Sequence, residues 1–249
     1  MTQLFGRRGV VLLVLGIVVA ACSPSDAAQT EIRVSAASSL TLAFGEIEIL
    51  FEERNPDVDV VFNFGSSALL REQILSGAPI HVFASADRHN MGMVDEFTVE
   101  DPVVFASNML MVAVPSGNPG AVTGLEDFGR DDLFLGLCAR GVPCGDLAIA
   151  ALEAAGVTTA KHSAETNARS LLIKTAEGEL DASIVYVSDV RTEPLVDGID
   201  IADQFNQSTE YPVAVVTGSP DGGDASSFIE FLLSETAQSV MSDHGFSAP

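Results

Sequence analysis

Short apolar runs alternate with longer stretches of helical periodicity along most of the chain. Residues 58–64 alternate apolar and polar side chains, as a half-buried strand does. Residues 41–53 instead carry apolar side chains at helical spacing, through Leu42, Ile47 and Leu50, and Pro56 follows soon after. The two periodicities predict a strand and a helix that are close neighbours in sequence.

The same alternation of elements continues to the end of the chain. Further strands are predicted at 32–36, 82–84, 109–114, 133–137, 182–187 and 213–217, and helices at 69–76, 146–155, 168–177, 225–233 and 235–244. Strands separated by helical stretches are typical of parallel α/β sheets. The pattern therefore predicts an α/β fold.

The first thirty residues have the character of an export signal. Arg7 and Arg8 precede an apolar and small-residue run from Gly9 to Ala21, which is too short for a membrane span. Cys22 follows small residues directly, which resembles the lipobox of bacterial lipoproteins. That resemblance implies a signal peptide over 1–21 and a lipidated tether over 22–30. Ordinary cleavage, with Cys22 a bystander, is the alternative.

The composition constrains the mature chain. Cleavage after residue 21 leaves 228 residues, which is enough for one large domain or two lobes. Loss of Arg7 and Arg8 leaves ten basic against 35 acidic residues, a formal net charge of −25. This charge argues against nucleic-acid binding through a basic surface. An anion site in such a protein must depend on local dipoles and hydrogen bonds, helped by salt screening over about 8–10 Å.

Two cysteines remain if Cys22 carries lipid. An exported chain meets an oxidising compartment, which favours a local disulfide between Cys138 and Cys144 over two free thiols. No paired Cys or His spacing accompanies them, so no metal-cation site is expected. The four histidines, at 81, 89, 162 and 244, are scattered along the chain.

Four predicted helices begin after turns rich in small or polar residues: Ser38-Ser39, Gly65-Ser66-Ser67, Pro143-Cys144-Gly145 and Glu165-Thr166-Asn167. A helix N-terminus carries unpaired N–H donors and about half a positive charge. Several such termini together can hold an oxyanion without Lys or Arg. Simple capping is the alternative for each turn, because Ser, Thr and Asn are favoured N-caps.

Two of these turns carry one hydroxyl more than a cap needs. Both Ser38-Ser39 and Ser66-Ser67 directly follow predicted strands. They should therefore lie at the same edge of one sheet, where ligands bind in open α/β folds.

An ordered set of short strings carries a resemblance to a known family. The strings are Val34-Ser35-Ala36-Ala37-Ser38-Ser39-Leu40-Thr41, Phe64-Gly65-Ser66-Ser67, Gln73-Ile74-Leu75-Ser76-Gly77-Ala78-Pro79, Val82-Phe83-Ala84-Ser85-Ala86-Asp87, Val142-Pro143-Cys144-Gly145, Ile184-Val185-Tyr186-Val187-Ser188-Asp189 and Tyr211-Pro212-Val213-Ala214-Val215-Val216. Together they resemble the periplasmic molybdate-binding proteins, the substrate-binding components of molybdate ABC importers, over nearly the whole mature chain.

The resemblance implies a two-lobed periplasmic-binding-protein fold, type II-like, with the anion enclosed between the lobes. Each lobe would be a mainly parallel sheet flanked by helices. Lobe one would hold residues 31–112 and 213–249, and lobe two residues 113–212. The chain would cross between them near Val114-Pro115 and Tyr211-Pro212.

The resemblance also implies a ligand set. Ser39 and Ser67 would offer hydroxyl and backbone N–H groups, Cys144 and Ala168 backbone N–H groups, and Tyr186 its phenol. Cys144 stands where the family often has Ala, and Ala168 where Val is common. His81 replaces an Asp usual in the family, and its role stays open.

The implied function is capture of molybdate or tungstate, with no cofactor, for the membrane permease and ATPase subunits of an ABC importer. The protein would be a monomer in the periplasm or at the outer face of the cytoplasmic membrane, held there by its lipid anchor.

Three other functions are alternatives to this one. Binding of another tetrahedral oxyanion, such as sulfate or phosphate, would use the same dipoles. An iron carrier would need more tyrosines than Tyr186 and Tyr211. A secreted serine hydrolase would need a Gly-x-Ser-x-Gly elbow, and Gly65-Ser66-Ser67-Ala68 lacks the second Gly, so no enzyme is expected.

Overall fold

The structure is a computed structural model that describes residue 2 and residues 29–159, 162–217 and 222–249. The expected cleavage site, Cys22 and nearly all of the expected signal peptide lie outside the described residues. Within the described part, none of the helices combines the length and the apolar character that a membrane crossing requires.

The described residues form nine strands, eight α-helices and three short 3-10 helices. The strands are β1 Thr30–Ala37, β2 Val58–Gly65, β3 Val82–Ala84, β4 Val103–Pro115, β5 Leu135–Cys138, β6 His162–Glu165, β7 Ala182–Tyr186, β8 Val196–Asp200 and β9 Ser208–Val215. The α-helices are α1 Thr41–Arg54, α2 Ser67–Leu75, α3 Arg88–Gly92, α4 Pro143–Ala154, α5 Ala168–Ala176, α6 Val187–Arg191, α7 Gly222–Leu232 and α8 Glu235–Asp243. The 3-10 helices are η1 Ser38–Leu40, η2 Asp95–Phe97 and η3 Leu125–Gly129.

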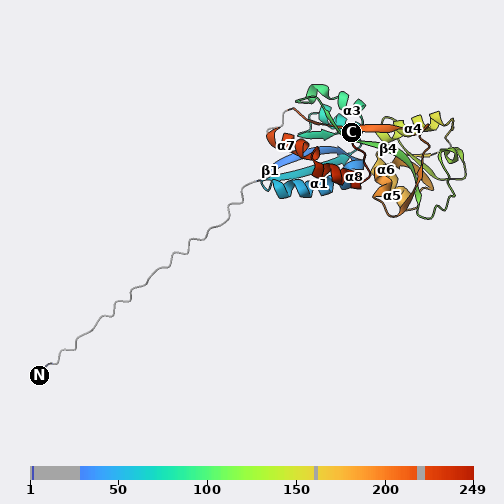
Figure 1. Ribbon diagram of the computed structural model, residues 1–249, viewed down its shortest axis with the longest axis horizontal. Coiled ribbons are helices and arrows are strands. Elements are labelled where there is room, and N and C mark those ends of the chain that lie inside the picture. The colour runs from blue at the N-terminus through green and yellow to red at the C-terminus, as the bar shows by residue number, and fades with distance from the viewer. Residues whose placement is uncertain (1, 3–28, 160–161, 218–221) are drawn as a thin grey trace.

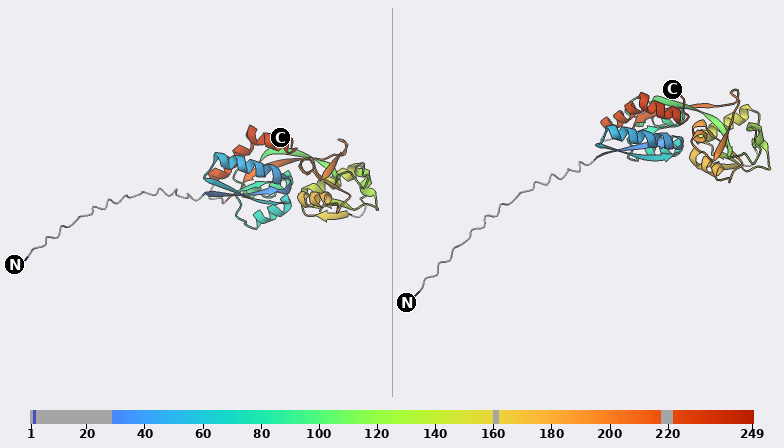
Figure 2. Two further views of the ribbon diagram at one scale, coloured as in Figure 1. Left: turned by 90° about the horizontal axis from the view of Figure 1, so that it is seen from below. Right: turned by 60° about the horizontal axis from the view of Figure 1, so that its bottom comes forward.

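These elements gather into two bodies that lie side by side (Figure 1). The first body has a core of Phe, Ile and Val side chains from β1, β2, α1, α7 and α8, including Phe44 and Phe228. The second body has a separate core built from β5, β7, α4, α5 and the part of β4 from Leu110 onward. The views in Figure 2 show the long strands β4 and β9 along the join between the two bodies. No core cluster of the described residues combines side chains from both bodies.

The strands share one mixed sheet in the order β2-β1-β3-β9-β4-β7-β5-β6, with β8 beside β4. The predicted parallel pairing holds at the two ends, where β1 pairs with β2 and β3, and β5 with β6 and β7. The central pairs, which involve β4 and β9, are antiparallel.

The join between the bodies is set by a change of partner along β4. This strand pairs with β9 up to Met109 and with β7 from Leu110 onward. The boundary expected from sequence, between residues 112 and 113, lies three residues further along. β9 begins at Ser208, before the second expected crossing at Tyr211-Pro212. The division into two lobes that move independently stays a prediction.

Helix α1 forms where the sequence predicts it, but the face that it buries matches the predicted apolar positions only in part. Ile47 is buried together with Ala43, Phe44 and Phe51, whereas Leu42 is 39% exposed. The rings of Phe44 and Phe51 both meet Phe228 edge-on, with centroids 6.2 and 5.3 Å away. Aromatic side chains bury the largest apolar area, so they select the face that packs.

The elements that the sequence pattern does not reveal are short or polar. β6 consists of His-Ser-Ala-Glu with no fully buried side chain, and α3 and α6 have five residues each. The first six residues of β4 were missed as well, because Ser107 and Asn108 interrupt its apolar run. Tertiary pairing, rather than periodicity, forms these segments.

Candidate functional site

The doubled serines emerge side by side from two neighbouring strands. β1 and β2 pair in parallel and end level with each other, Ala37 opposite Gly65. Ser38 and Ser39 follow the first strand, and Ser66 and Ser67 follow the second. The prediction that both serine pairs lie at one edge of one sheet is therefore confirmed.

The two serines at the start of α2 have different tasks. Ser66 is the N-cap, and its Oγ accepts a hydrogen bond from the Leu69 N–H at 3.3 Å. Ser67 is already the first helical residue, two positions before the predicted start, and its buried Oγ accepts from the Ala86 N–H at 2.9 Å. A hydroxyl that accepts in this way still has its own proton to donate. Capping therefore explains Ser66 and leaves Ser67 free to act as a donor.

Ser39 lies in the short helix η1, and its hydroxyl contacts a residue far away in sequence. Its Oγ is 2.9 Å from the Tyr211 Oη, and either atom can be the donor. Tyr211 belongs to β9 and is fully buried. Burial raises the pKa of the Tyr211 phenol well above its ordinary value, so the phenol keeps its proton.

Helix α4 begins at Pro143, three residues before the predicted start, so Cys144 lies inside its first turn. Proline at the first position has no N–H to leave unpaired, and the N–H groups of a first turn have no intrahelical acceptor. The expected disulfide between Cys138 and Cys144 is present and joins the end of β5 to this turn. A Cβ on Gly145 would collide with the carbonyl groups of Cys138 and Ala139, so the turn fits closely against the strand end.

Helix α5 begins at Ala168, as the sequence predicts, and the start of its first turn lines the cavity. Asn167 is the N-cap, and its Oδ1 accepts from the Ser170 N–H at 2.8 Å. The N–H of Ala168 precedes the intrahelical ladder and has no helical acceptor. Cys144 and Ala168 therefore place two helix N-termini of the second body opposite the serines of the first.

Tyr186 is the last residue of β7 and the fifth of the residues expected to contact the ligand. Its side chain is buried, yet its Oη has no hydrogen-bond partner among the residues that the structure describes. A buried polar atom without a partner costs about 1–3 kcal/mol, so such atoms are rare in folded proteins. Burial raises the pKa of the Tyr186 phenol well above its ordinary value, and the nearby Tyr211, Asp189 and Asp87 act in the same direction. The phenol therefore remains a donor.

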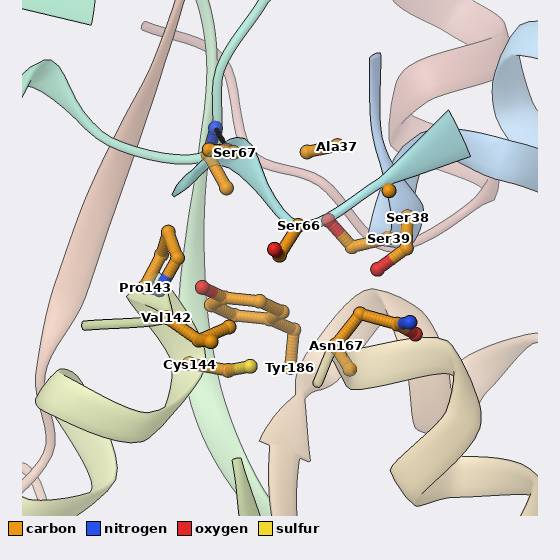
Figure 3. Close-up of a pocket in the computed structure, with 13 residues that line it drawn as sticks. Ala37, Ser38, Ser39, Ser66, Ser67, Val142, Pro143, Cys144, Asn167 and Tyr186 are labelled. Carbon is orange, nitrogen blue, oxygen red and sulfur yellow. Dashed lines mark hydrogen bonds between the residues drawn. The ribbon is translucent and has the colours of Figure 1, made fainter. Parts of the chain in front are cut away.

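All five residues expected to contact the ligand line one cavity between the two bodies: Ser39, Ser67, Cys144, Ala168 and Tyr186. In Figure 3 the serines lie on one side, and Pro143, Cys144, Asn167 and Tyr186 on the other. The cavity is narrow, about 10 Å³, the space that one water needs. No charged side chain is among its lining residues in the described part of the chain. It is a small pocket walled by neutral donors.

One further residue near the site was missed by sequence reasoning. Asp189 lies on the first turn of α6, where one of its side-chain oxygens accepts from the Tyr186 N–H at 3.1 Å. Burial raises its pKa to about 7, against the opposing effects of this N–H and of Arg169. Only its place in the string shared with Tyr186 could have marked it.

His81, whose role the sequence left open, lies away from the cavity, and so do Arg71 and Arg169. The buried His81 accepts from the Arg33 N–H through Nδ1 at 3.0 Å, so it supports the edge of β1. Arg71 donates to Asn90 and Glu72, and Arg169 lies 3.8 Å from Glu193. Within the described residues, no group of His, Cys, Asp and Glu side chains is arranged to hold a metal ion.

A family model decides what kind of protein carries this pocket. The model described as bacterial extracellular solute-binding protein matches residues 32–247. The chain belongs to this family. Membership makes it a solute-binding protein rather than an enzyme. This agrees with the sequence around Ser67, which lacks the second glycine of a serine-hydrolase elbow.

Relatives of this solute-binding protein support the resemblance seen in its sequence strings. The molybdate-binding protein ModA of Mycobacterium tuberculosis is 30% identical over 248 residues, 96% of this chain and 95% of that one. ModA of Haemophilus influenzae is 29% identical, over 93% of this chain and 96% of its own. The resemblance to molybdate-binding proteins therefore extends over almost the whole length.

Solved structures share the fold. The substrate-binding domain of a putative molybdenum ABC transporter from Clostridium difficile is 27% identical, with a TM-score of 0.66 over 89% of this chain and all of that one. The periplasmic molybdate-binding protein of Azotobacter vinelandii has a TM-score of 0.78 at 17% identity, over 88% and 99% of the two chains. The sulfate-binding protein SubI of Mycobacterium tuberculosis has a TM-score of 0.77 at 17% identity, over 88% and 87%. At these last identities the likeness concerns the fold alone.

Proposed function

We propose that this solute-binding protein captures molybdate, or the related tungstate, between its two bodies and delivers it to an ABC importer. The observation that carries the proposal is the buried Tyr186 hydroxyl, which has no described protein partner and lines a cavity of neutral donors. An oxyanion would supply the missing acceptor. The relatives of about 30% identity that are named as molybdate-binding support this choice of ligand.

The proposed contacts divide between the two bodies. Ser39 and Ser67 would donate through hydroxyl and N–H groups from the first body. Cys144 and Ala168 would donate through N–H groups, and Tyr186 through its phenol, from the second. Each hydrogen bond to a charged oxygen contributes about 1.5–3 kcal/mol. Several of them, after the cost of desolvating a dianion, suffice for about micromolar affinity, which corresponds to roughly −8 kcal/mol.

Closure of the bodies would accompany binding. A tetrahedral oxyanion is larger than the cavity, which has about the volume of one water, so the two walls must separate to admit it and then meet around it. Because the donors come from both walls, the ligand stabilises the closed arrangement, as in other hinged binding proteins. We assign residues 31–112 and 213–249 to one lobe and 113–212 to the other, with their exact limits to be set by the motion itself.

Neutral donors also fit the charge of the whole protein. The mature chain would carry a net charge of −25, which repels anions at long range, while screening over about 8–10 Å limits that repulsion at physiological salt. At the cavity the dipoles of the helix N-termini act over a few ångströms. We infer that capture depends on these short-range contacts and that release to the importer meets no cationic side chain.

The cellular setting follows from the sequence features outside the described residues. We propose that the chain is exported, cleaved before Cys22 and held at the membrane by a lipid on that thiol, as a monomer that docks with permease and ATPase subunits. Substitution of Cys22 by Ser is expected to release the protein from the membrane fraction, with wild type as control. Equal membrane retention of both would contradict the anchor.

The ligand is tested by thermal unfolding of the purified protein with molybdate, tungstate, sulfate or phosphate added separately. A ligand that binds only the folded state stabilises it by about 2.7 kcal/mol at a hundredfold excess over its dissociation constant. We expect a clear upward shift of Tm with molybdate and tungstate and little with the others. A shift of Tm with sulfate or phosphate alone would mean that the protein binds one of these oxyanions instead of molybdate. No shift with any of the four would refute an oxyanion function.

A further inference from the structure

The hydroxyl of Tyr211 lies against a proposed ligand residue rather than against the cavity. Its Oη is 2.9 Å from the Ser39 Oγ, although the two residues are 172 positions apart in sequence. Tyr211 is not among the residues that line the cavity. Its hydroxyl therefore reaches the cavity through Ser39, whereas its ring also meets that of Tyr186.

The Tyr211 ring is held from several sides. Its centroid lies 5.4 Å from that of Phe246 and 6.2 Å from those of Phe105 and Tyr186, all in edge-on contacts. Its backbone pairs with Ala106 of β4. A side chain packed in this way keeps its hydroxyl in one place, so the position of the Ser39 hydroxyl is held as well.

The direction of the hydrogen bond between the two hydroxyls decides whether Ser39 can serve an anion. Ser39 has a single hydroxyl proton. If it donates that proton to Tyr211, its side chain has nothing left to donate into the cavity. If Tyr211 donates to Ser39, the Ser39 proton is free. A fully ionised oxyanion offers only acceptors, so its presence favours the second arrangement.

We propose that Tyr211 is a positioning residue for oxyanion binding, whose phenol donates to the Ser39 Oγ and thereby directs the Ser39 proton at the anion. The inference rests on the function proposed above and deepens it. It assigns a task to a residue outside the ligand contacts expected from sequence.

Two observations agree with this direction of donation. Burial raises the pKa of the Tyr211 phenol, so its proton stays in place and is available for donation. Ser67, the other proposed serine ligand, already accepts from a fixed donor, the Ala86 N–H at 2.9 Å. In both serines a protein donor fills the acceptor position and leaves the hydroxyl proton for the ligand.

The test is a double-mutant cycle on the full chain, read by calorimetric titration with molybdate. Tyr211→Phe keeps the ring and removes the hydroxyl, and Ser39→Ala removes the group through which it acts. We expect Tyr211→Phe to raise Kd about tenfold, the effect of losing about 1.4 kcal/mol. In the Ser39→Ala background the same change should leave Kd unaltered, because the relay is already broken.

A matched control is Ser38→Ala, which removes the neighbouring hydroxyl. In the described structure, that hydroxyl makes no hydrogen bond with Tyr211. In that background Tyr211→Phe should still raise Kd about tenfold. The positioning role would be overturned if Tyr211→Phe raised Kd by the same factor in the Ser39→Ala background. It would also be overturned if Tyr211→Phe changed Kd in neither the Ser39→Ala nor the Ser38→Ala background. If wild type itself fails to bind molybdate, the proposed function is wrong. Failure of the proposed function is therefore distinguishable from failure of the positioning role.

A second measurement covers the case in which Tyr211→Phe does not fold. The chain has two tyrosines, so fluorotyrosine labelling of Tyr186→Phe leaves Tyr211 as the one labelled tyrosine. Its fluorine resonance should shift when saturating molybdate is added, and should stay in place when Ser39→Ala is also present. An equal shift in both proteins would contradict a relay through Ser39.

Discussion

The disulfide between Cys138 and Cys144 joins the last residue of β5 to the second residue of α4. The helix start that it holds is one of the chain segments at the cavity, and Cys144 itself lines the cavity. A covalent link at this point restrains the direction in which the first-turn N–H groups point. Preorganised donors bind more tightly than mobile ones, because less freedom is lost on binding.

Replacing both cysteines by serine should therefore affect stability and binding together. In the chain-entropy model, a disulfide closing so short a loop stabilises a protein by about 2 kcal/mol. We expect a loss of that size in urea unfolding and a several-fold rise in the Kd for molybdate. Wild type treated with a reductant should behave like the double variant, and the double variant should ignore the reductant. Unchanged unfolding and affinity would show that the link contributes nothing.

The tight fit of the same turn predicts a second effect. A methyl group at Gly145 would meet the carbonyl groups of Cys138 and Ala139, so Gly145→Ala should destabilise the fold by more than about 2 kcal/mol and weaken binding. Gly45 in the middle of α1 is the matched control, because a methyl group there meets nothing within 4 Å. Gly45→Ala should stabilise the protein by up to about 1 kcal/mol. Similar behaviour of the two variants in urea unfolding would contradict the close packing.

Tyr186→Phe should separate binding from stability. The variant loses a proposed donor to the anion, so Kd for molybdate should rise by about tenfold to a hundredfold, which corresponds to roughly 1.5–3 kcal/mol. It also removes a buried hydroxyl that has no partner in the described structure, so the unliganded protein should be as stable as wild type or more stable. Calorimetric titration and urea unfolding measure the two quantities. A large loss of stability would indicate that the hydroxyl has a protein partner.

Because Asp189 is buried, we expect the stability of the protein to depend on pH. Its folded-state pKa is raised to about 7 from an ordinary value of 3.8, chiefly by burial, so the folded protein holds this proton more strongly than the unfolded chain. Its contribution to stability is therefore fully present below about pH 4 and is lost as the pH rises toward 7, by at most about 1.4 kcal/mol per pH unit.

The matched variant for this prediction is Asp189→Asn, which keeps an oxygen to accept from the Tyr186 N–H but does not titrate in this range. The difference in free energy of unfolding between wild type and variant, measured by urea at several pH values, should change between pH 4 and pH 7. Above pH 7 the variant should be the more stable protein. A difference that stays constant with pH would mean that Asp189 ionises as an ordinary exposed carboxylate.

Local sequence patterns determined much of this protein. The alternation along 58–64 and the helical spacing along 41–53 depend on residues close in sequence, so the elements could be predicted from them. The serine pairs after β1 and β2 could be placed at one sheet edge because parallel neighbours end on the same side. The ordered family strings led to the five residues that the structure brings to one cavity, and family membership agrees with the solute-binding function.

Tertiary structure alone decided the rest. The face that α1 buries follows from the aromatic contacts of Phe44 and Phe51 with Phe228, about 180 residues away, and the partner change at Met109 follows from non-local strand pairing. Which serine caps a helix, which hydroxyl is left without a partner, and the bond between Ser39 and Tyr211 depend on through-space packing. Periodicity records which residues are apolar, whereas burial and hydrogen-bond partners arise only when distant segments meet.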